Sequence, residues 1–209
     1  MKNRSRFHYS FAVALLGTLV LAGCAPVRYP QSYTLNVPRV APRSTPSPEP
    51  LGTLAIREFR CPDYLCEGRI VYRPSEEEVG FYEYHRWATN PRQAITQSIA
   101  DTLRAKSLFT SVATQEGGIE AAYVLSGKIE RLEEVDRGRD VRAVCTLSAQ
   151  LLNARTRSVV WSGAASETVP VESRNMAGVV SSLSAAARMA VDRLVESMEK
   201  ELASAEASK

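Results

Sequence analysis

The sequence predicts an α+β domain, a largely antiparallel sheet with two helices packed on one face, preceded by a lipidated, proline-rich tether. Three observations predict this fold. Strand-like segments come in two groups, and one amphipathic helical segment follows each group, an order typical of α+β domains. Apolar side chains alternate strictly over residues 141–151, which indicates a strand with one buried face. Seven of the 11 prolines lie in residues 26–50, a composition that favours extended, solvated backbone.

Residues 1–23 are typical of a secretory signal peptide. Three basic residues come before an apolar stretch, 11–21, that is too short to span a bilayer as a helix. The stretch ends in Leu-Ala-Gly-Cys, which resembles the bacterial lipobox, so we expect the mature chain to begin at a lipidated Cys24. Acyl chains on its sulfur and amine would hold the protein on a membrane essentially permanently. A plain secretory signal that happens to end near a cysteine is the alternative interpretation.

The residue after Cys24 indicates which membrane carries the anchor. In enteric bacteria an Asp at this position favours retention in the inner membrane, whereas this chain has Ala25. We therefore expect the protein on the periplasmic face of the outer membrane.

The charge of the mature chain argues against nucleic-acid binding. Without the three basic residues of the signal peptide, 23 of the 26 basic residues remain against 23 acidic residues. A neutral chain without a long basic run lacks the electrostatic surface that binds nucleic acid. We expect no nucleic-acid partner.

Residues 24–50 are expected to form the tether, and residues 51–203 the folded domain. Fully extended, the tether could span about 90 Å. Residues 33–37 alternate enough to form a short strand that docks on the edge of the domain.

The first group of elements has three expected strands, at residues 52–60, 69–73 and 79–85. A helix should follow over residues 90–106. Asn90 is suited to the N-cap and Pro91 to the first helical position, while Ile95, Ile99 and Leu103 recur on one face. Residues 108–113 should then be extended.

The second group predicts three long strands in an antiparallel meander, at residues 121–135, 141–151 and 158–169. A closing amphipathic helix should run from about residue 173 to about residue 202, with an Ala- and Ser-rich middle that suits close packing on a sheet. With both helices on one face, the other face of the sheet must be wet or must meet a partner.

The sequence contains no recognisable catalytic motif. His85 is the only histidine after the signal peptide, and the chain has no G-x-S-x-G, no H-E-x-x-H and no glycine-rich phosphate loop. We expect no catalytic residue and no cofactor. An envelope enzyme that uses His85 or a periplasmic thiol is the least favoured of three hypotheses.

Three cysteines remain after Cys24. The favoured interpretation is a disulfide between Cys61 and Cys66, because the periplasm is oxidising, with Cys145 as a buried thiol. A zinc site of Cys61, Cys66, His85 and Cys145 is the alternative, but this spacing matches no common zinc pattern. We therefore expect no metal.

Aromatic residues are dense in residues 81–87, just before the first helix. One interpretation packs alternate members, Phe81 and Trp87 first, beneath that helix. The other places the outward members on a surface that meets a protein or lipid partner, a role for which Tyr, Trp and Arg are well suited.

Four features together resemble the ABC-type transport auxiliary lipoproteins. They are the lipobox, a Tyr-Thr-Leu segment at residue 33, Gly-Arg-Ile-Val-Tyr-Arg at 68–73 and Tyr-Glu-Tyr-His-Arg-Trp-Ala at 82–88. The resemblance covers essentially the whole mature chain. It implies a non-enzymatic accessory role beside a protein with MCE (mammalian cell entry) domains and, through it, an ABC permease that moves phospholipids or other hydrophobic molecules. Because MCE proteins form ring-shaped assemblies, the resemblance also implies that a chain docked on the end of such a ring is a homo-oligomer.

The resemblance supplies no catalytic residues, so the motif side chains are expected to contact a partner or to support the fold. These partner-contact candidates are Tyr72, Arg73, Tyr84, His85, Arg86 and Trp87. The competing hypothesis is a structural or secretion-associated outer-membrane lipoprotein with no transport partner.

Overall fold

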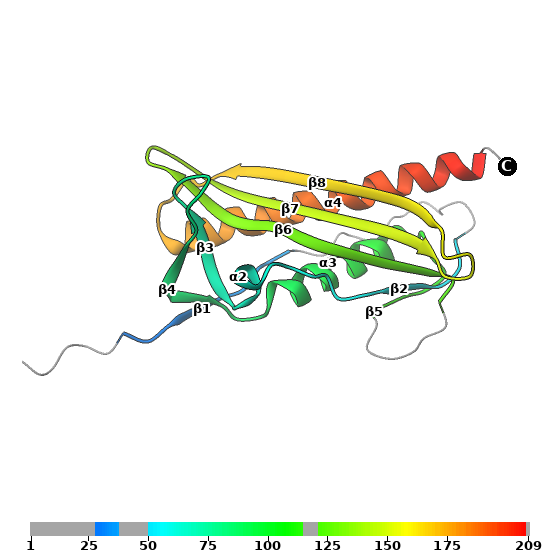
Figure 1. Cartoon of the computed structure of the whole chain (residues 1–209), viewed down its shortest axis with the longest axis horizontal. Helices are drawn as coiled ribbons and strands as arrows, with labels where there is room; N and C mark the ends of the chain where they lie inside the picture. The colour runs from blue at the N-terminus through cyan, green and yellow to red at the C-terminus, as the bar shows by residue number, and fades with distance from the viewer. Residues whose placement is uncertain (1–27, 38–49, 115–120, 208–209) are drawn as a thin grey trace, which may run out of the picture.

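The computed structural model describes residues 28–37, 50–114 and 121–207. In this part of the chain one eight-stranded sheet is combined with three helices (Figure 1). In chain order the elements are β1 (Gln31–Tyr33), β2 (Leu54–Ile56), α2 (Asp63–Cys66), β3 (Arg69–Arg73), β4 (Gly80–Trp87), α3 (Pro91–Lys106), β5 (Val112–Thr114), β6 (Tyr123–Arg137), β7 (Asp140–Asn153), β8 (Val159–Pro170) and α4 (Met176–Ala207). The expected signal peptide, Cys24 and residues 38–49 of the expected tether lie outside the described residues.

The predicted meander is confirmed and forms the main body of the sheet. Strand β7 pairs antiparallel with β6 on one side and with β8 on the other over almost its whole length. The β6–β7 turn contains Gly138 with φ 73°, a left-handed conformation that glycine adopts without steric cost. Its amide also donates to the Asp136 carboxylate at 2.9 Å.

The second edge of β6 carries two short branches. Near its start β6 pairs with β2, which pairs in turn with β5; near its end it pairs with β3, which leads to β4 and β1. The sheet is therefore open, with β8 at one edge (Figure 1). The ladders β1–β4, β2–β5, β2–β6 and β3–β6 are parallel, which the sequence analysis does not anticipate. Because these ladders are short, the sheet is still mostly antiparallel.

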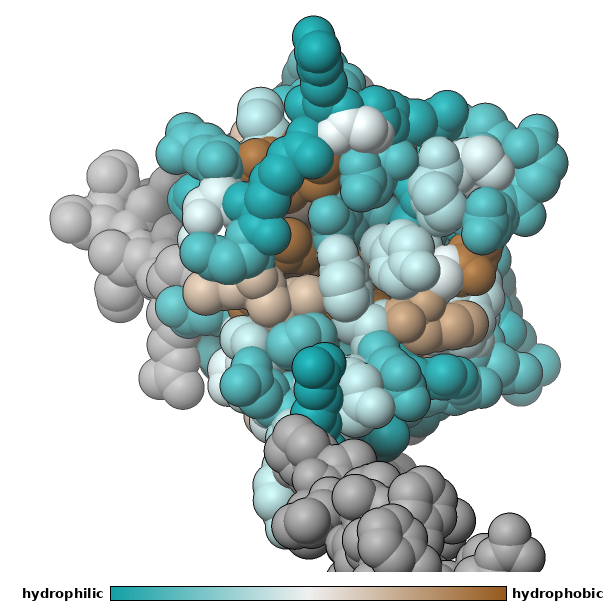
Figure 2. Space-filling model, turned by 90° about the vertical axis from the view of Figure 1, so that its left-hand side faces the viewer, coloured by the Kyte–Doolittle hydropathy of each residue, from teal (hydrophilic) through white to brown (hydrophobic). Residues whose placement is uncertain are grey.

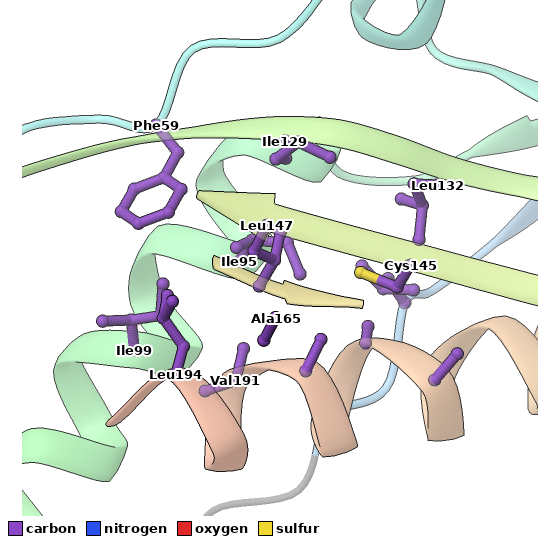
Figure 3. Packing of buried hydrophobic residues seen from close by; sticks show 14 of the residues in the cluster. Phe59, Ile95, Ile99, Ile129, Leu132, Cys145, Leu147, Ala165, Val191 and Leu194 are labelled. Carbon is purple, nitrogen blue, oxygen red and sulfur yellow. The ribbon is translucent and has the colours of Figure 1, made fainter. Parts of the chain in front are cut away.

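Both long helices cover one face of this sheet, as predicted. Ile95 and Ile99 of α3 and Leu194 of α4 are buried against Leu147 of β7 and Ile129 of β6 (Figure 3). In α4, Ala186, Ala187 and Ala190 have no exposed surface, and their small side chains let the helix approach the sheet closely.

The helix boundaries follow their predicted signals closely. The Asn90 side chain accepts a hydrogen bond from the amide of Arg92 at 3.0 Å, and Pro91 is the first residue of α3. The helix ends at Ser107, whose φ of 53° is left-handed. The closing helix α4 begins three residues later than predicted and continues to Ala207. No helix in the described ranges is both long and apolar enough to cross a membrane.

A short strand does dock on the edge of the domain, but it covers Gln31–Tyr33, and residues 34–37, where the strand is expected, are not in a strand. Strand β1 pairs parallel with β4, with Gln31 opposite His85. Beyond it Leu35 is buried at 6% exposure, and the Asn36 amide donates to the Ser184 hydroxyl of α4 at 3.0 Å. Residues 31–37 are therefore part of the folded body, so only a short stretch of chain separates Cys24 from the domain.

Candidate functional site

The motif of residues 81–87 lies on a bulged corner of the sheet. Strand β3 advances by two residues from Arg69 to Val71, while their partners on β4 are Arg86 and Phe81, five residues apart. The extra residues of β4 cannot pair with β3, and such a bulge bends a strand and re-aims its side chains. Strand β4 bends here and passes from β3 to β1 (Figure 1).

Two of the motif aromatics belong to the body of the domain. Trp87 is 7% exposed, and its amide donates to the carbonyl of Gly68 at 2.7 Å. Phe81 is half-buried, and the guanidinium of Arg69 lies 4.2 Å from the centre of its ring. Both residues fit the interpretation that alternate members of the motif pack inward.

A row of rings connects β3, β4 and β1. The ring centres of Tyr72 and Tyr82 are 5.0 Å apart, those of Tyr82 and His85 5.8 Å, and those of His85 and Tyr33 5.6 Å. The bulge explains why Tyr82 and His85, three residues apart on one strand, lie edge to face. The Nδ1 atom of His85 is buried and makes no hydrogen bond within the described residues. The imidazole is thus packed between tyrosines as part of this row.

Two consecutive glutamates of β6 anchor the row and its neighbour Arg73. Glu133 has no exposed side-chain surface and accepts from the Arg73 guanidinium at 2.9 and 3.2 Å and from Arg131 at 2.7 Å. The hydrogen bond to Glu133 raises the pKa of Arg73, although burial opposes this. Glu134, 4% exposed, accepts from the Tyr82 hydroxyl at 2.6 Å. Burial raises the pKa of Glu134, against the opposing effect of that hydrogen bond, and burial also raises the pKa of Tyr82.

Replacement of Glu134 by Gln is expected to stabilise the domain more at pH 7.5 than at pH 4. The folded-state pKa of Glu134 is raised, so the folded state holds this proton more tightly than the unfolded state. The free energy of unfolding therefore falls as the pH rises from the unfolded pKa through the folded one, and Gln removes this loss while its carbonyl still accepts from Tyr82. Urea unfolding of both proteins at the two pH values measures the difference.

Glu130→Gln is the matched control, because the same substitution should show the opposite trend. The hydrogen bond from Lys128 lowers the pKa of Glu130, so its contribution to stability is present above the unfolded pKa and is lost as the pH falls. Glu130→Gln should thus weaken the domain more at pH 7.5 than at pH 4. The same pH trend in both variants would contradict the assignment.

The cysteines are arranged as the favoured interpretation has them. Cys61 and Cys66 form a disulfide around α2, with their Cα atoms 6.2 Å apart. The Asn90 side-chain amide donates to the carbonyl of Cys66 at 3.2 Å and so connects this loop to the start of α3. Cys145 is a free thiol in the core of the sheet, and burial raises its pKa to about 12. The described ranges contain no group of three or more His, Cys, Asp or Glu side chains that could hold a metal ion.

Only two of the six partner-contact candidates have freely exposed side chains. Tyr84 and Arg86 are exposed, whereas Trp87 lies in the core and His85 in the row of rings. The ring of Tyr72 contacts that of Tyr82 at an interplanar angle of 52°, and Arg73 is 15% exposed beside Glu133. The structure brings the candidates together at one end of the sheet, where most of them contact one another or the core.

A second surface, which the sequence analysis does not resolve into residues, is the sheet face opposite the helices. Small or polar side chains cover it, and Ser162, Ala164, Ser166 and Thr168 of β8 alternate with inward residues. A hollow of about 470 Å³ lies on this face; among the side chains that line it are Lys128, Glu130, Ser148, Gln150 and Ser162. The signal for this surface in the sequence is the small or hydroxyl-bearing residue at every second position of β8.

A larger hollow of about 650 Å³ lies beside α3. Leu35, Ile56 and Thr96 are among the residues that line it, together with Asp101 and Thr114. Four separate stretches of the chain supply these residues, so the local sequence contains no signal for the hollow. Its lining mixes apolar and polar side chains and does not assemble a recognisable catalytic group.

Two solved structures share this fold. No match was found among curated proteins. Among solved structures, protein XCC0632 from Xanthomonas campestris is 23% identical with a TM-score of 0.67, over 79% of this chain and 92% of that chain. The hypothetical protein CT253 from Chlamydia trachomatis is 8% identical with a TM-score of 0.50, over 71% of this chain and 96% of that chain. At these identities the likeness shows a shared fold.

The family itself comes from the sequence match. The model of the ABC-type transport auxiliary lipoprotein component matches residues 33–198, which span the body from the end of β1 almost to the end of α4. Members are auxiliary lipoproteins of ABC transport systems, which agrees with a lipid-anchored envelope protein. This chain belongs to the ABC-type transport auxiliary lipoprotein component family.

Proposed function

We propose that the protein is a non-enzymatic accessory subunit of an MCE/ABC-type system that transports phospholipids or other hydrophobic molecules in the Gram-negative envelope. The family match over residues 33–198 is the observation that carries this proposal. Cys24 would bear the lipid and hold the domain on the periplasmic face of the outer membrane. The domain would dock on the MCE-domain protein and, through it, act with the ABC permease.

The open face of β6, β7 and β8 is the surface that best suits this docking. It lies opposite α3 and α4, and the short outward side chains of β8 (Ser162, Ala164, Ser166 and Thr168) lose little conformational entropy when a partner covers them. The hydroxyls of Thr146 and Ser166 lie 2.8 Å apart across β7 and β8, so polar groups are already arranged in rows. Strand β8 pairs only with β7 among the described strands, so its outer edge is open to further pairing.

Ser166→Arg should abolish co-purification of the MCE protein while the domain stays folded. A long charged side chain in the middle of this polar face would keep a partner from approaching and would leave an unpaired charge in the interface. We expect at least about a tenfold loss of recovered partner, a difference of about 1.4 kcal/mol. The measurement is mass spectrometry of the tagged, gently solubilised lipoprotein and its partners.

Ser181→Arg, on an exposed position of α4, is the control with the same chemical change. It should leave the partner bound, and both variants should unfold at the wild-type urea concentration. If wild-type protein retains acylated Cys24 but brings down no MCE protein, the transport role fails and the structural lipoprotein without a transport partner takes its place.

A further inference from the structure

We propose that the corner of the domain around Tyr29, Tyr84 and Arg86 rests on the headgroup region of the membrane that carries the lipid anchor. We call this the membrane-facing corner. The inference rests on the proposed lipidation of Cys24 and adds an orientation that the proposed function does not contain. It also assigns a role to the two motif residues, Tyr84 and Arg86, whose side chains point outward.

The first argument is the length of the chain. Cys24 precedes Gln31, the first residue of β1, by seven residues, and a fully extended chain of that length spans at most about 25 Å. A relaxed chain would span about 15 Å. Strand β6 alone, with 15 residues, is about 50 Å long. The anchor is therefore much shorter than the domain, so β1 stays within about 25 Å of the membrane and the far end of the domain can lie much further away.

The second argument is the position of β1. The strand pairs with the end of β4, with Gln31 opposite His85 and Ser32 opposite Arg86, which places the entry of the chain directly beside Tyr84. The C-terminal end of α4 lies at the opposite end of the molecule (Figure 1). The far end of the domain, with β2 and β5, would thus extend into the periplasm.

The third argument is the chemistry of the corner. Tyr29 and Tyr84 are 79% and 37% exposed, which makes them two of the four most exposed large apolar side chains of the described residues. Tyrosine is typical of membrane interfaces, because its ring packs among lipid while its hydroxyl stays hydrated. Figure 2 shows hydrophobic residues reaching the surface of this end between hydrophilic ones. Val79 and Phe81 of this end are half-buried.

Basic side chains at the corner are offset by acidic ones. The proposed contact with the lipid headgroups is therefore not a purely electrostatic one. Arg28 and Arg86 are exposed, but Glu83 is exposed on the same strand as Arg86, and Glu76, Glu77 and Glu78 are exposed just before Val79. Each basic residue near an anionic surface contributes about 1 kcal/mol, and these acidic residues offset it. The contact should therefore depend on the tyrosines and change little with salt.

The test uses the full acylated protein in vesicles of phosphatidylethanolamine and phosphatidylglycerol, without any partner. Glu83→Cys introduces an exposed thiol for an environment-sensitive fluorophore and keeps both tyrosines, while buried Cys145 and the Cys61–Cys66 disulfide remain unlabelled. Glu201→Cys, on the last turns of α4, reports on the far end. Lipid spin-labelled near the headgroup should quench the fluorophore at residue 83 at least about twice as strongly as at residue 201.

Substitutions at the corner should reduce this difference. Tyr29→Ser with Tyr84→Ser should reduce quenching at residue 83, whereas Val159→Ser, which removes an apolar side chain 53% exposed at the start of β8, should not. Equal quenching at residues 83 and 201 would overturn the orientation. So would an unmodified Cys24 peptide in mass spectrometry, since the anchor would then be absent. Loss of the MCE partner with quenching intact would instead refute the transport role and leave the orientation standing.

Discussion

Replacing Trp87 by alanine should destabilise the domain by about 4 kcal/mol, because the indole is almost fully buried. The side chain belongs to the same cluster as Leu35, Ile70 and Ile95, where β1, β3 and α3 come together. Its loss would leave a cavity at the point where two branches of the chain are joined. Urea unfolding followed by circular dichroism measures the effect without depending on the indole itself.

Tyr84→Ala is the control within the same motif, three residues earlier. Its side chain is exposed, so its removal should change the free energy of unfolding by no more than about 0.5 kcal/mol. Trp87→Phe should recover most of the loss, because a second large ring refills the site. Equal effects of Trp87→Ala and Tyr84→Ala would mean that the bulged corner is packed differently. This pair therefore separates the structural members of the motif from the exposed ones.

The elements with local signals were predicted well from the sequence. The start of α3 depends on Asn90 and Pro91, and its buried face on side chains four residues apart, all of which are neighbours in the chain. The alternation in β7 likewise specifies its buried face without reference to any partner strand. The spacing of apolar residues by threes and fours is enough to predict helix α4, although the helix begins three residues later than expected.

The parts that depend on distant partners could not be predicted. The parallel ladders of β2 and β3 arise because the meander leaves one edge of β6 open, and nothing in either short strand specifies its direction. In residues 81–87 the alternation of side chains predicts a regular strand. In the structure, however, β4 advances by five residues, from Phe81 to Arg86, where β3 advances by only two. The row of Tyr33, Tyr72, Tyr82 and His85 follows from this bulge and from β1.

The burial of two carboxylates in the candidate site could not be predicted from the sequence either. Glu133 and Glu134 are consecutive residues of a predicted strand, and alternation alone would place one of them in water. Their partners Arg73 and Tyr82 lie 60 and 52 residues away in sequence, so no local pattern could reveal that both are buried. The family motif nevertheless includes both partners, which indicates that part of the motif serves to satisfy these charges.

Glu133→Ala should cost about 3 kcal/mol, because it leaves the nearly buried Arg73 guanidinium without its counter-charge. Glu133 accepts three hydrogen bonds, two from Arg73 and one from Arg131, and all three would be lost. Arg131 is 38% exposed and can turn to water, whereas Arg73 is 15% exposed and would keep only its hydrogen bond to the carbonyl of Glu76. Thermal and urea unfolding of the variant measure the loss.

The double variant Arg73→Met with Glu133→Leu tests the cause of this loss. If the cost of Glu133→Ala comes from an unpaired buried charge, replacing both charges by apolar side chains of similar size should restore most of the stability. Glu67→Ala breaks a solvent-exposed pair with Arg69 and should cost no more than about 0.5 kcal/mol. A double variant as unstable as Glu133→Ala would mean that the pair determines the geometry of the sheet. In that case Arg73 would fix where β3 joins β6, and with it the position of the whole membrane-facing corner.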